Sequence, residues 1–407
     1  MLVFVIAVIV SVLVAELVLD SLNLHHRHQP IPENVAHLYD EAKYQTWLAY
    51  TMVNFKLSTV SKAVRTVVLL GLLLFGFFGF LEDFVTDLTA NALFQLPLFL
   101  GSIALIFYVV GLPFRIVRTF GVEERFGFNK TTPKLFVIDA LKSLALTFVF
   151  GGGILILLAL IFEQFSERLG LLLGVTYGAL VTLMVVIFLI NGFLIRTFNT
   201  LTPLEEGSLK SQIDALAEKL GFSIRRIFVM DASKRSTKLN AFFTGLGKTR
   251  EVVLFDTLVD KLGEDEIVSV LAHELGHATH KDAPRMLIQQ MLYVGFYMAI
   301  LGFIVSTPAL FTAFGLGGVH FGFALLLLLY LVQPFDLLSG IVFNHLSRVA
   351  EYKADAFAVK HTSAQAMQGA LEKLAVENLA NLTPHPVYQL VYYSHPTMSK
   401  RLKALEK

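Results

Sequence analysis

Seven apolar runs, each long enough to cross a membrane as a helix, constrain this chain more than any other feature. A helix needs about 20 apolar residues to cross roughly 30 Å of hydrocarbon. The runs cover residues 2–20, 66–86, 92–113, 144–163, 170–194, 286–307 and 321–343. Hydrophobic residues make up 55% of the 407 and charged residues only 16%, which is too apolar for a soluble chain. The sequence therefore predicts an integral membrane protein.

The charge and the cysteine count narrow the classes of partner and of site. With 33 basic and 32 acidic side chains the overall charge is near zero, so nothing in it favours nucleic acid as a partner. The chain has no cysteine, which excludes disulfides, thiolate ligands and thiol catalysis. Histidine, aspartate and glutamate remain as the strong metal ligands.

Basic residues gather in alternate loops. Five Lys or Arg lie in residues 22–65 and six in 114–143, whereas the loop between the second and third runs has none. Because basic loops stay on the cytoplasmic side, we expect the N-terminus outside and every large loop inside. The first run has no basic residues before it and is longer than the apolar part of a usual secretion signal, so we count it as a retained span. The polar segments 195–285 and 344–407 then lie on one side and can build a single site.

The first polar segment is expected to be a small folded domain. An amphipathic helix is predicted over 203–221, and strands over 226–230 and 251–255. Between them, the sequence Asn-Ala-Phe-Phe-Thr-Gly at 240–245 suggests a further strand. This strand is either an ordinary member of the sheet or an edge that pairs with an extended peptide.

A metal-binding motif follows this domain. His273 and His277 bracket Glu274 in the pattern H-E-x-x-H. On a helix, positions i and i+4 lie on one face, so both imidazoles can bind one tetrahedral metal, with Glu274 beside its open position. Charged residues flank the motif on both sides, which favours a membrane surface or a wet cavity over the lipid-facing midplane. An exposed polar helix face is the simpler alternative.

A catalytic zinc needs a third protein ligand and one open position. His280 is the nearest spare imidazole, but a solvated helix end suits it better. Glu351 and Asp355, after the seventh run, share one helical face. One carboxylate can bind the metal while the other orients a ligating histidine. Such a pair is often only a solvated face, yet beside two motif histidines we favour ligation.

These motifs resemble those of the type I CAAX prenyl proteases, a family of gluzincin-type membrane zinc endopeptidases. H-E-L-G-H is followed, after two apolar runs, by N-x-x-S-R-x-x-E-Y-x-A-D. The likeness covers most of the chain and includes residues 126–132, 240–242, 393–396 and Arg401. It implies a mainly α membrane protein, with seven transmembrane helices forming a barrel around a chamber and an α/β zinc metalloprotease domain on the inside face.

The expected domains follow from the runs and the motifs. They are 1–194 with five transmembrane helices and basic inside loops, 195–285 with the H-E-x-x-H helix, 286–343 with two transmembrane helices, and 344–407 with the E-x-x-x-D helix.

The resemblance assigns the roles of the metal site residue by residue. It implies one Zn²⁺ ion held by His273, His277 and Glu351. It makes Glu274 the general base and Asp355 the carboxylate that supports a ligating histidine.

The resemblance also implies residues that hold the substrate. His395 and Arg401 match residues that hold the peptide or the developing oxyanion, with His395 counted as catalytic. Asn240, Ala241 and Phe242 match the strand that aligns the peptide. Without the resemblance, His395 would be a turn residue and Arg401 part of a basic helix.

The expected activity is zinc-dependent cleavage near the C-terminus of prenylated or other membrane-associated proteins. The partners would be a peptide or protein substrate and the lipid bilayer, in the endoplasmic reticulum or a bacterial inner membrane, with the active-site domain on the cytoplasmic side. A membrane quality-control zinc protease is the nearest alternative, although that family usually has fewer spans. A transporter or channel would not need Glu274, and a catalytically dead scaffold would not retain it. The cluster His25-His-Arg-His28 suits a juxtamembrane loop better than a second metal site.

Overall fold

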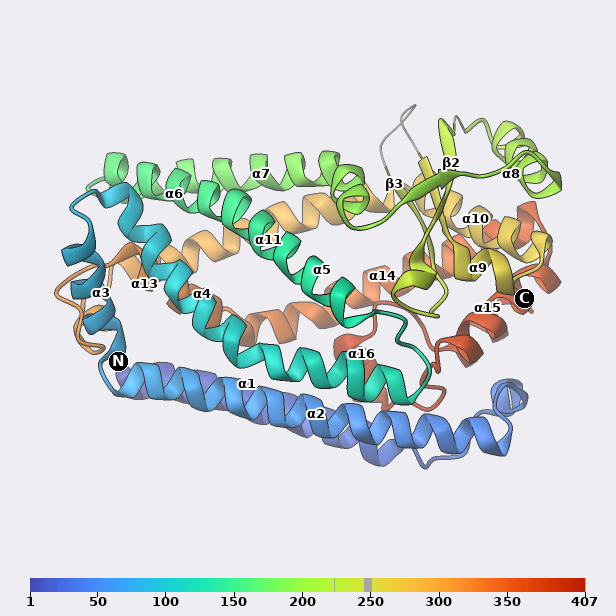
Figure 1. Ribbon diagram of the computed structural model, residues 1–407, viewed down its shortest axis with the longest axis horizontal. Coiled ribbons are helices and arrows are strands. Elements are labelled where there is room, and N and C mark those ends of the chain that lie inside the picture. Colours follow the sequence, from blue (N-terminus) through green and yellow to red (C-terminus); the bar gives the residue numbers. More distant parts are fainter. Residues whose placement is uncertain (223, 245–250, 407) are drawn as a thin grey trace.

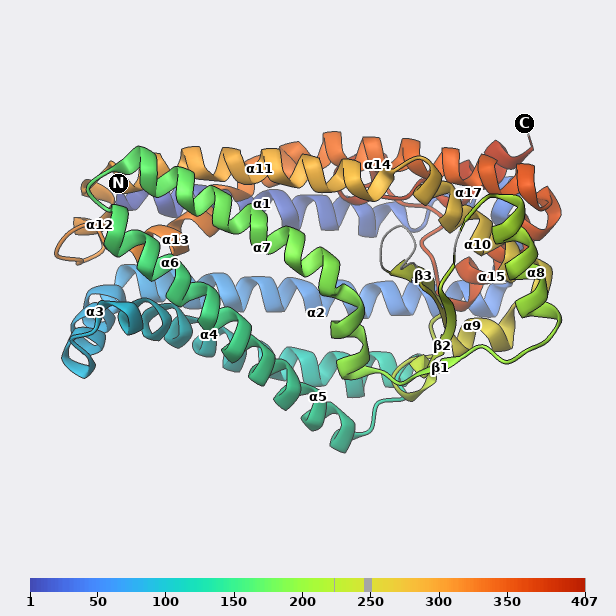
Figure 2. The ribbon, with the colours of Figure 1, turned by 90° about the horizontal axis from the view of Figure 1, so that it is seen from above.

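The computed structural model of the protein describes residues 1–222, 224–244 and 251–406. Long helices run along the longest axis, and a small α/β part lies at the end that also holds the C-terminus (Figure 1). The N-terminus lies at the opposite end in this view and in the view from above (Figure 2). Large apolar side chains point outward along the helices, as in Phe148 with 82% of its surface exposed and Leu292 with 71%. Lipid is the solvent that suits such a surface.

Within the described residues, six helical runs are long and apolar enough to cross a membrane. They are α1 (Leu2–His26), α2 (Glu41–Leu74), α4 (Ala92–Ile116) with the π-helix η2 (Val117–Glu123), α5 (Pro133–Leu146) with η3 (Thr147–Gly151) and α6 (Gly152–Phe165), α7 (Leu169–Phe198), and α11 (Asp282–Val305). A seventh is obtained if α13 (Phe321–Leu331) and α14 (Gln333–His361), bent by 48° at their junction, count as one span. The seven predicted runs each find a counterpart here.

The prediction misplaced the second span. It set the span at 66–86, but α2 ends at Leu74 and a separate helix, α3 (Phe77–Leu88), follows. Gly76 lies between them with a φ of 70°, a left-handed conformation that interrupts a helix and suits glycine. The span is supplied instead by the longer α2, which begins at Glu41 where Asp40 accepts a hydrogen bond from Lys43 N.

The basic loop expected over 114–143 is largely helical. α4 continues into η2, and α5 starts at Pro133, where Thr132 accepts a hydrogen bond from Leu135 N. Proline suits the first position of a helix because that position needs no intrahelical N–H bond.

The α/β part contains one four-stranded sheet among the described residues. Its order is β1 (Leu201–Pro203), β2 (Arg226–Met230), β4 (Glu251–Phe255), β3 (Ala241–Thr244), with β2 and β4 parallel and the outer pairs antiparallel. The predicted strands are confirmed, and β3 lies at an edge of the sheet; Gly245 falls outside the described residues. The predicted helix is α8 (Ser208–Lys219), which ends just before Gly221 at a φ of 68°.

The remaining helices complete the cap around the sheet. They are α9 (Asp256–Lys261), α10 (Glu264–Thr279), α15 (Ala364–Glu377), α16 (Pro386–Tyr392) and α17 (Met398–Leu405), with the short η1 (Glu33–Leu38) and η4 (Ala232–Lys234). The short α12 (Ala309–Thr312) lies instead at the far end of the membrane part, near the N-terminus (Figure 2). Glu266 starts α10 by accepting a hydrogen bond from Gly263 N at 2.7 Å. α10 then packs closely on α14, since a β-carbon on Gly276 would lie 3.0 Å from Ala354 Cα. This contact brings a cap helix against the helix that rises from the membrane part.

Candidate metal centre

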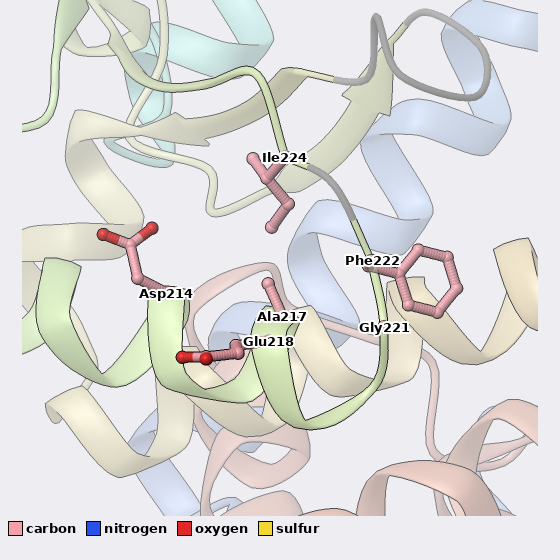
Figure 3. A pocket seen from close by; sticks show the side chains of 6 residues that line it. All are labelled: Asp214, Ala217, Glu218, Gly221, Phe222 and Ile224. Atoms are coloured by element: carbon pink, nitrogen blue, oxygen red, sulfur yellow. The ribbon is translucent and has the colours of Figure 1, made fainter.

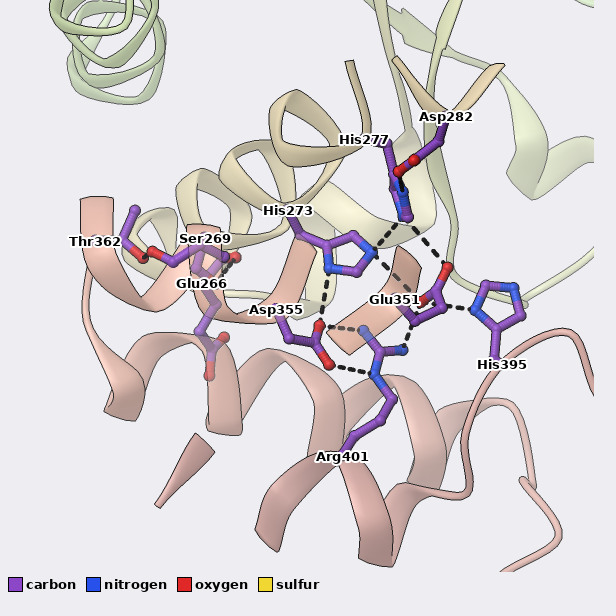
Figure 4. Close-up of polar contacts among 11 residues, drawn as sticks. Glu266, Ser269, His273, His277, Asp282, Glu351, Asp355, Thr362, His395 and Arg401 are labelled. Carbon is purple, nitrogen blue, oxygen red and sulfur yellow. Dashed lines mark hydrogen bonds and ion pairs between the residues drawn. The ribbon is translucent and has the colours of Figure 1, made fainter. Parts of the chain in front are cut away.

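Two helices bring the three predicted ligands together. α10 presents His273 and His277, whose Nε2 atoms lie 3.2 Å apart, and α14 presents Glu351 (Figure 4). One oxygen of Glu351 is 3.2 Å from His277 Nε2, and the other is 3.6 Å from His273 Nε2. One ligand atom from each residue lies within 4.8 Å of the others. Two imidazoles and a carboxylate are a usual donor set for zinc.

Each of the two imidazoles is held from behind by a carboxylate. His273 Nδ1 lies 2.8 Å from Asp355 Oδ1, and His277 Nδ1 lies 2.9 Å from Asp282 Oδ2 (Figure 4). A ring N–H at Nδ1 leaves the Nε2 lone pair free to bind a cation. The donor set and its supports therefore fit a divalent metal ion.

Asp282 is the site residue that the sequence reasoning missed. It was counted only among the charges that flank the motif. It begins α11, and its side chain is buried against His277. The available signal was an aspartate five residues beyond His277, just past the end of the motif helix.

Arg401 lies behind the ligands. Its Nε and Nη2 atoms contact the two oxygens of Asp355 at 2.8 and 2.6 Å, and Nη1 is 3.6 Å from Glu351 Oε2. Asp355 is only 1% exposed, so this two-pronged contact neutralises a carboxylate that is removed from water. The predicted substrate contact of Arg401 stays a prediction, and in this geometry the guanidinium holds Asp355 and, through it, His273.

His395 joins the cluster from the segment after α16. Its Nδ1 atom lies 2.8 Å from Glu351 Oε2, while the side chain stays 62% exposed. Two side chains of α14 hold the end of α16 from which this segment leaves. Asn344 Nδ2 donates to Val391 O at 2.6 Å, and Arg348 Nη1 donates to Tyr393 O at 2.6 Å. One face of α14 thus carries the predicted ligand Glu351 and also holds in place the segment that leads to His395.

The electrostatics of the cluster favour a bound cation. Burial raises the pKa of Glu274, which lies beside His273 on α10. Although burial alone would lower it, hydrogen bonds with Glu351 and Asp282 raise the pKa of His277 to about 9. Burial would raise the pKa of Glu351, but its hydrogen bonds with His277 and His395 hold it far below the usual range. The acidic groups around His277 therefore favour a positive charge at this position.

The predicted peptide-aligning residues lie on the edge strand and at its start. Ala241 and Phe242 belong to β3, and β3 contacts α10. Asn240 is exposed just before the strand, and its Oδ1 accepts from Ala241 N at 2.9 Å. Among the described residues no strand pairs with the outer edge of β3, so the structure brings a free strand edge next to the helix of the proposed metal ligands.

Two other histidine groups do not join the ligands. His280 caps the end of α10, and its ring lies 6.0 Å from that of Phe357. His25 and His26 end α1, where the ring of His26 lies 5.2 Å from that of His385. Neither group belongs to the set of converging donors found among the described residues.

A surface depression of about 480 Å³ beside α8 is separate from this chemistry. Its lining residues are Asp214, Ala217, Glu218, Gly221, Phe222 and Ile224 (Figure 3). None of them is a residue of the metal centre.

The membrane helices, the H-E-x-x-H helix and the distal glutamate together define the class of the protein, which is a membrane metalloendopeptidase. Residues 203–407 match Peptidase family M48, and residues 21–196 match the CAAX prenyl protease N-terminal region, described as five membrane helices. The chain belongs to peptidase family M48, in its CAAX prenyl protease branch.

Similar proteins cover most of the chain. CAAX prenyl protease 1 of Saccharomyces cerevisiae is 36% identical over 324 residues, which are 76% of this chain and 71% of that protein. The CAAX prenyl protease 1 homolog of Oryza sativa is 31% identical over 92% of this chain and 90% of its own length. The crystal structure of S. mikatae Ste24p matches with a TM-score of 0.94 at 29% identity, over 100% of this chain and 99% of that one. The predicted fold, a membrane helix barrel around a chamber with an α/β protease domain, is confirmed.

Proposed function

We propose that this protein is a zinc endopeptidase that cleaves prenylated proteins near their C-terminus. The observation that carries the proposal is the convergence of His273 Nε2, His277 Nε2 and Glu351, each held by a second polar group, beside Glu274. The substrate class rests on the relatives, which are named CAAX prenyl proteases.

In this proposal, His273, His277 and Glu351 hold the metal. Bound zinc supplies a Lewis acid that polarises a carbonyl and lowers the pKa of water. Asp355 and Asp282 keep the two imidazoles in the orientation that exposes Nε2, and Arg401 fixes Asp355. We therefore assign Arg401 a positioning role.

Glu274 is the proposed general base. Its carboxylate takes a proton from the attacking water while the water oxygen bonds to the carbonyl carbon. As the peptide C–N bond breaks, the same carboxyl group gives that proton to the leaving amine. Its place next to His273 on α10 supports this double role.

His395 and the edge strand are proposed to hold the peptide. Nδ1 of His395 contacts Glu351, which leaves the opposite ring nitrogen for the developing oxyanion. A peptide paired with β3, alongside Asn240, Ala241 and Phe242, would present its backbone in extended form. Recognition would then depend more on shape than on any one side chain.

We further propose that the catalytic domain, formed by 195–285 and 344–407, faces the cytoplasm. The support is the excess of Lys and Arg in residues 22–65 and 114–143, compared with the segments between the other spans. The membrane would be the endoplasmic reticulum or a bacterial inner membrane.

Cleavage of a defined peptide tests this function. Purified protein loaded with zinc is incubated with a farnesylated C-a-a-X peptide and with the same peptide lacking the farnesyl group, and the products are identified by mass spectrometry. We expect loss of the last three residues from the farnesylated peptide, at a rate well above that for the unmodified one. Intact farnesylated peptide with zinc retained would refute the assignment, and equal rates would refute the preference for prenylated substrates.

A further inference from the structure

A cavity of about 380 Å³ lies between α1, α2, η2 and the end of α16. α16 packs against both α14 and α1, so along part of their length it lies between the metal-bearing helix and the pair of N-terminal helices (Figure 1). The cavity is therefore next to the metal centre but on the other side of α16.

The cavity carries one cation without a partner. Arg118, on η2, lines it, and within the described part of the chain Arg118 makes no ion pair or hydrogen bond. The acid in the same wall, Asp20, is already paired with Lys62 at 2.9 Å, and Lys62 also holds Glu16 at 3.0 Å. Among the charged residues that line the cavity, Arg118 is thus the one available to bind a charged ligand.

Neutral polar and apolar groups complete the lining. Asn54, Ser58 and Tyr388 provide an amide and two hydroxyls, while Trp47 and Leu379 provide apolar surface. A guanidinium beside hydroxyl and amide groups suits a carboxylate, which takes paired N–H donors. The apolar walls suit the short apolar side chains of a peptide that lie next to its terminal carboxylate.

The cavity and the metal centre are connected by a short piece of chain. Tyr393 lines the cavity, and His395, two residues later, contacts the ligand Glu351 at 2.8 Å. Two residues span at most about 7 Å, and an extended tripeptide spans roughly 10 Å. Arg348 holds the carbonyl of Tyr393 at 2.6 Å, so this link is fixed to α14. Tyr393, in the wall of the cavity, therefore lies within about the length of a tripeptide of the residue that contacts Glu351.

We propose that this cavity binds the free C-terminal carboxylate of the substrate, with Arg118 as the residue that recognises the charge. The inference rests on the proposed function and adds a reason why cleavage occurs close to a chain end. If the C-terminus of the substrate binds in the cavity, the distance from the cavity to the metal determines which peptide bond is cleaved.

The test compares two peptides that differ only in their C-terminal group, and two variants that each replace one arginine of the same segment. The binding of two farnesylated C-a-a-X peptides, one ending in a carboxylate and one in a carboxamide, is measured on the zinc-loaded Glu274→Gln protein, alone and with Arg118→Gln. Arg115→Gln is the control, because Arg115 is on the preceding turn and lies over the rings of Tyr108 and Phe136, away from the cavity lining. Cleavage of both peptides by the wild type is followed in parallel.

We expect the carboxylate peptide to bind about tenfold more tightly than the carboxamide, as for a charge-assisted hydrogen bond. Arg118→Gln should abolish this ratio by weakening only the carboxylate peptide, and Arg115→Gln should leave it unchanged. A ratio near one in the parent, or a ratio that Arg118→Gln leaves intact, would overturn the proposal. So would the loss of co-purified anionic phospholipid in Arg118→Gln with both peptides binding alike, because the cavity would then hold a lipid headgroup. Wild-type protein that binds zinc but cuts neither peptide would count instead against the proposed function.

Discussion

At the scale of single residues, the centre depends on carboxylates that bind no metal. Asp355 and Asp282 each face the Nδ1 atom of one imidazole, and Arg401 donates hydrogen bonds from Nε and Nη2 to Asp355. A buried imidazole without such a partner can rotate or take the other tautomer, and its Nε2 lone pair then no longer faces the metal. The affinity of the site should therefore respond to residues one layer behind the ligands.

Asp282→Asn tests this layer. An amide is a weaker acceptor than a carboxylate and carries no charge, so we expect zinc affinity to fall about 10- to 100-fold. Competition with a chelator of known affinity measures the change. Asp265→Asn is the control, because Asp265 is exposed in the first turn of α10, the helix that carries His277. Equal affinities in the two variants would remove Asp282 from the metal centre.

The sequence predicted the ligands more readily than their supports, for a physical reason. The spacing of His273 and His277 fixes one helical face, and Glu351 with Asp355 fixes another, so both pairs are visible as periodicity. Asp282 lies beyond the end of α10, after Lys281 at a φ of 58°, where helical periodicity no longer applies. The tertiary contact of His395 with Glu351 is likewise invisible to spacing, and the family resemblance pointed to His395 without predicting this contact.

At the scale of elements, the ligand geometry requires α10 and α14 to lie unusually close. Gly276, inside the motif, is the point of contact, and a β-carbon there would lie 3.0 Å from Ala354 Cα and 3.2 Å from Phe357 Cβ. Because the neighbour is a helix backbone, it cannot swing aside. The glycine therefore sets the distance over which Glu351 reaches the imidazoles.

Gly276→Ala should push the two helices apart. We expect a loss of stability of about 1–3 kcal/mol from overpacking, and weaker zinc binding, because Glu351 moves with α14. Thermal unfolding in detergent, with and without zinc, measures both effects. Gly153→Ala serves as the control, since nothing lies within 4 Å of its added β-carbon. A Gly276→Ala protein as stable as this control would contradict the close packing.

α16 acts as a second positioning element. Arg348 donates to the carbonyls of Gln389 and Tyr393, and so directs the segment that carries His395. We expect Arg348→Met to lower kcat about tenfold with zinc content unchanged, because it misplaces His395, the proposed oxyanion donor. In a His395→Ala background the same change should have little further effect. If the two losses simply add, Arg348 does not act through His395.

Element boundaries show where sequence reasoning reached its limit. The strands β2 and β4 and the helix α8 were predicted because alternation and amphipathic period are local properties. The break at Gly76 was missed because it interrupts one continuous apolar run, where composition does not change. The bend between α13 and α14 was missed for a different reason, because Gln333 and Pro334 at the junction are a sequence signal that a count of apolar residues does not use.

At the scale of the whole molecule, the two larger apolar cores among the described residues share a small number of long helices. One core fills the membrane part, with Phe78, Phe99 and Phe323 fully buried. The other fills the α/β cap and includes Trp47 from α2. α2 and α14 extend from the membrane part into the cap. Glu351 lies on the part of α14 that packs against the cap core. The site is therefore built where the two cores meet.

Removing the metal should leave this architecture intact. α10 and α14 are held by apolar packing as well as by the site, so a chelator should abolish cleavage while the helical circular dichroism signal stays unchanged. Added zinc should restore the activity. A large loss of helix on chelation would instead make the metal a structural requirement of the fold.

The central claim is that a zinc ion and Glu274 together hydrolyse a peptide bond, and one paired measurement tests it most directly. Zinc content and cleavage of the farnesylated peptide are measured on the same preparations of wild type and Glu274→Gln. The account predicts about one zinc per chain in both, as for a site with an intact ligand set, and a 10²- to 10⁴-fold loss of cleavage in the variant. A variant that retains its zinc and cleaves as fast as the wild type would contradict the account.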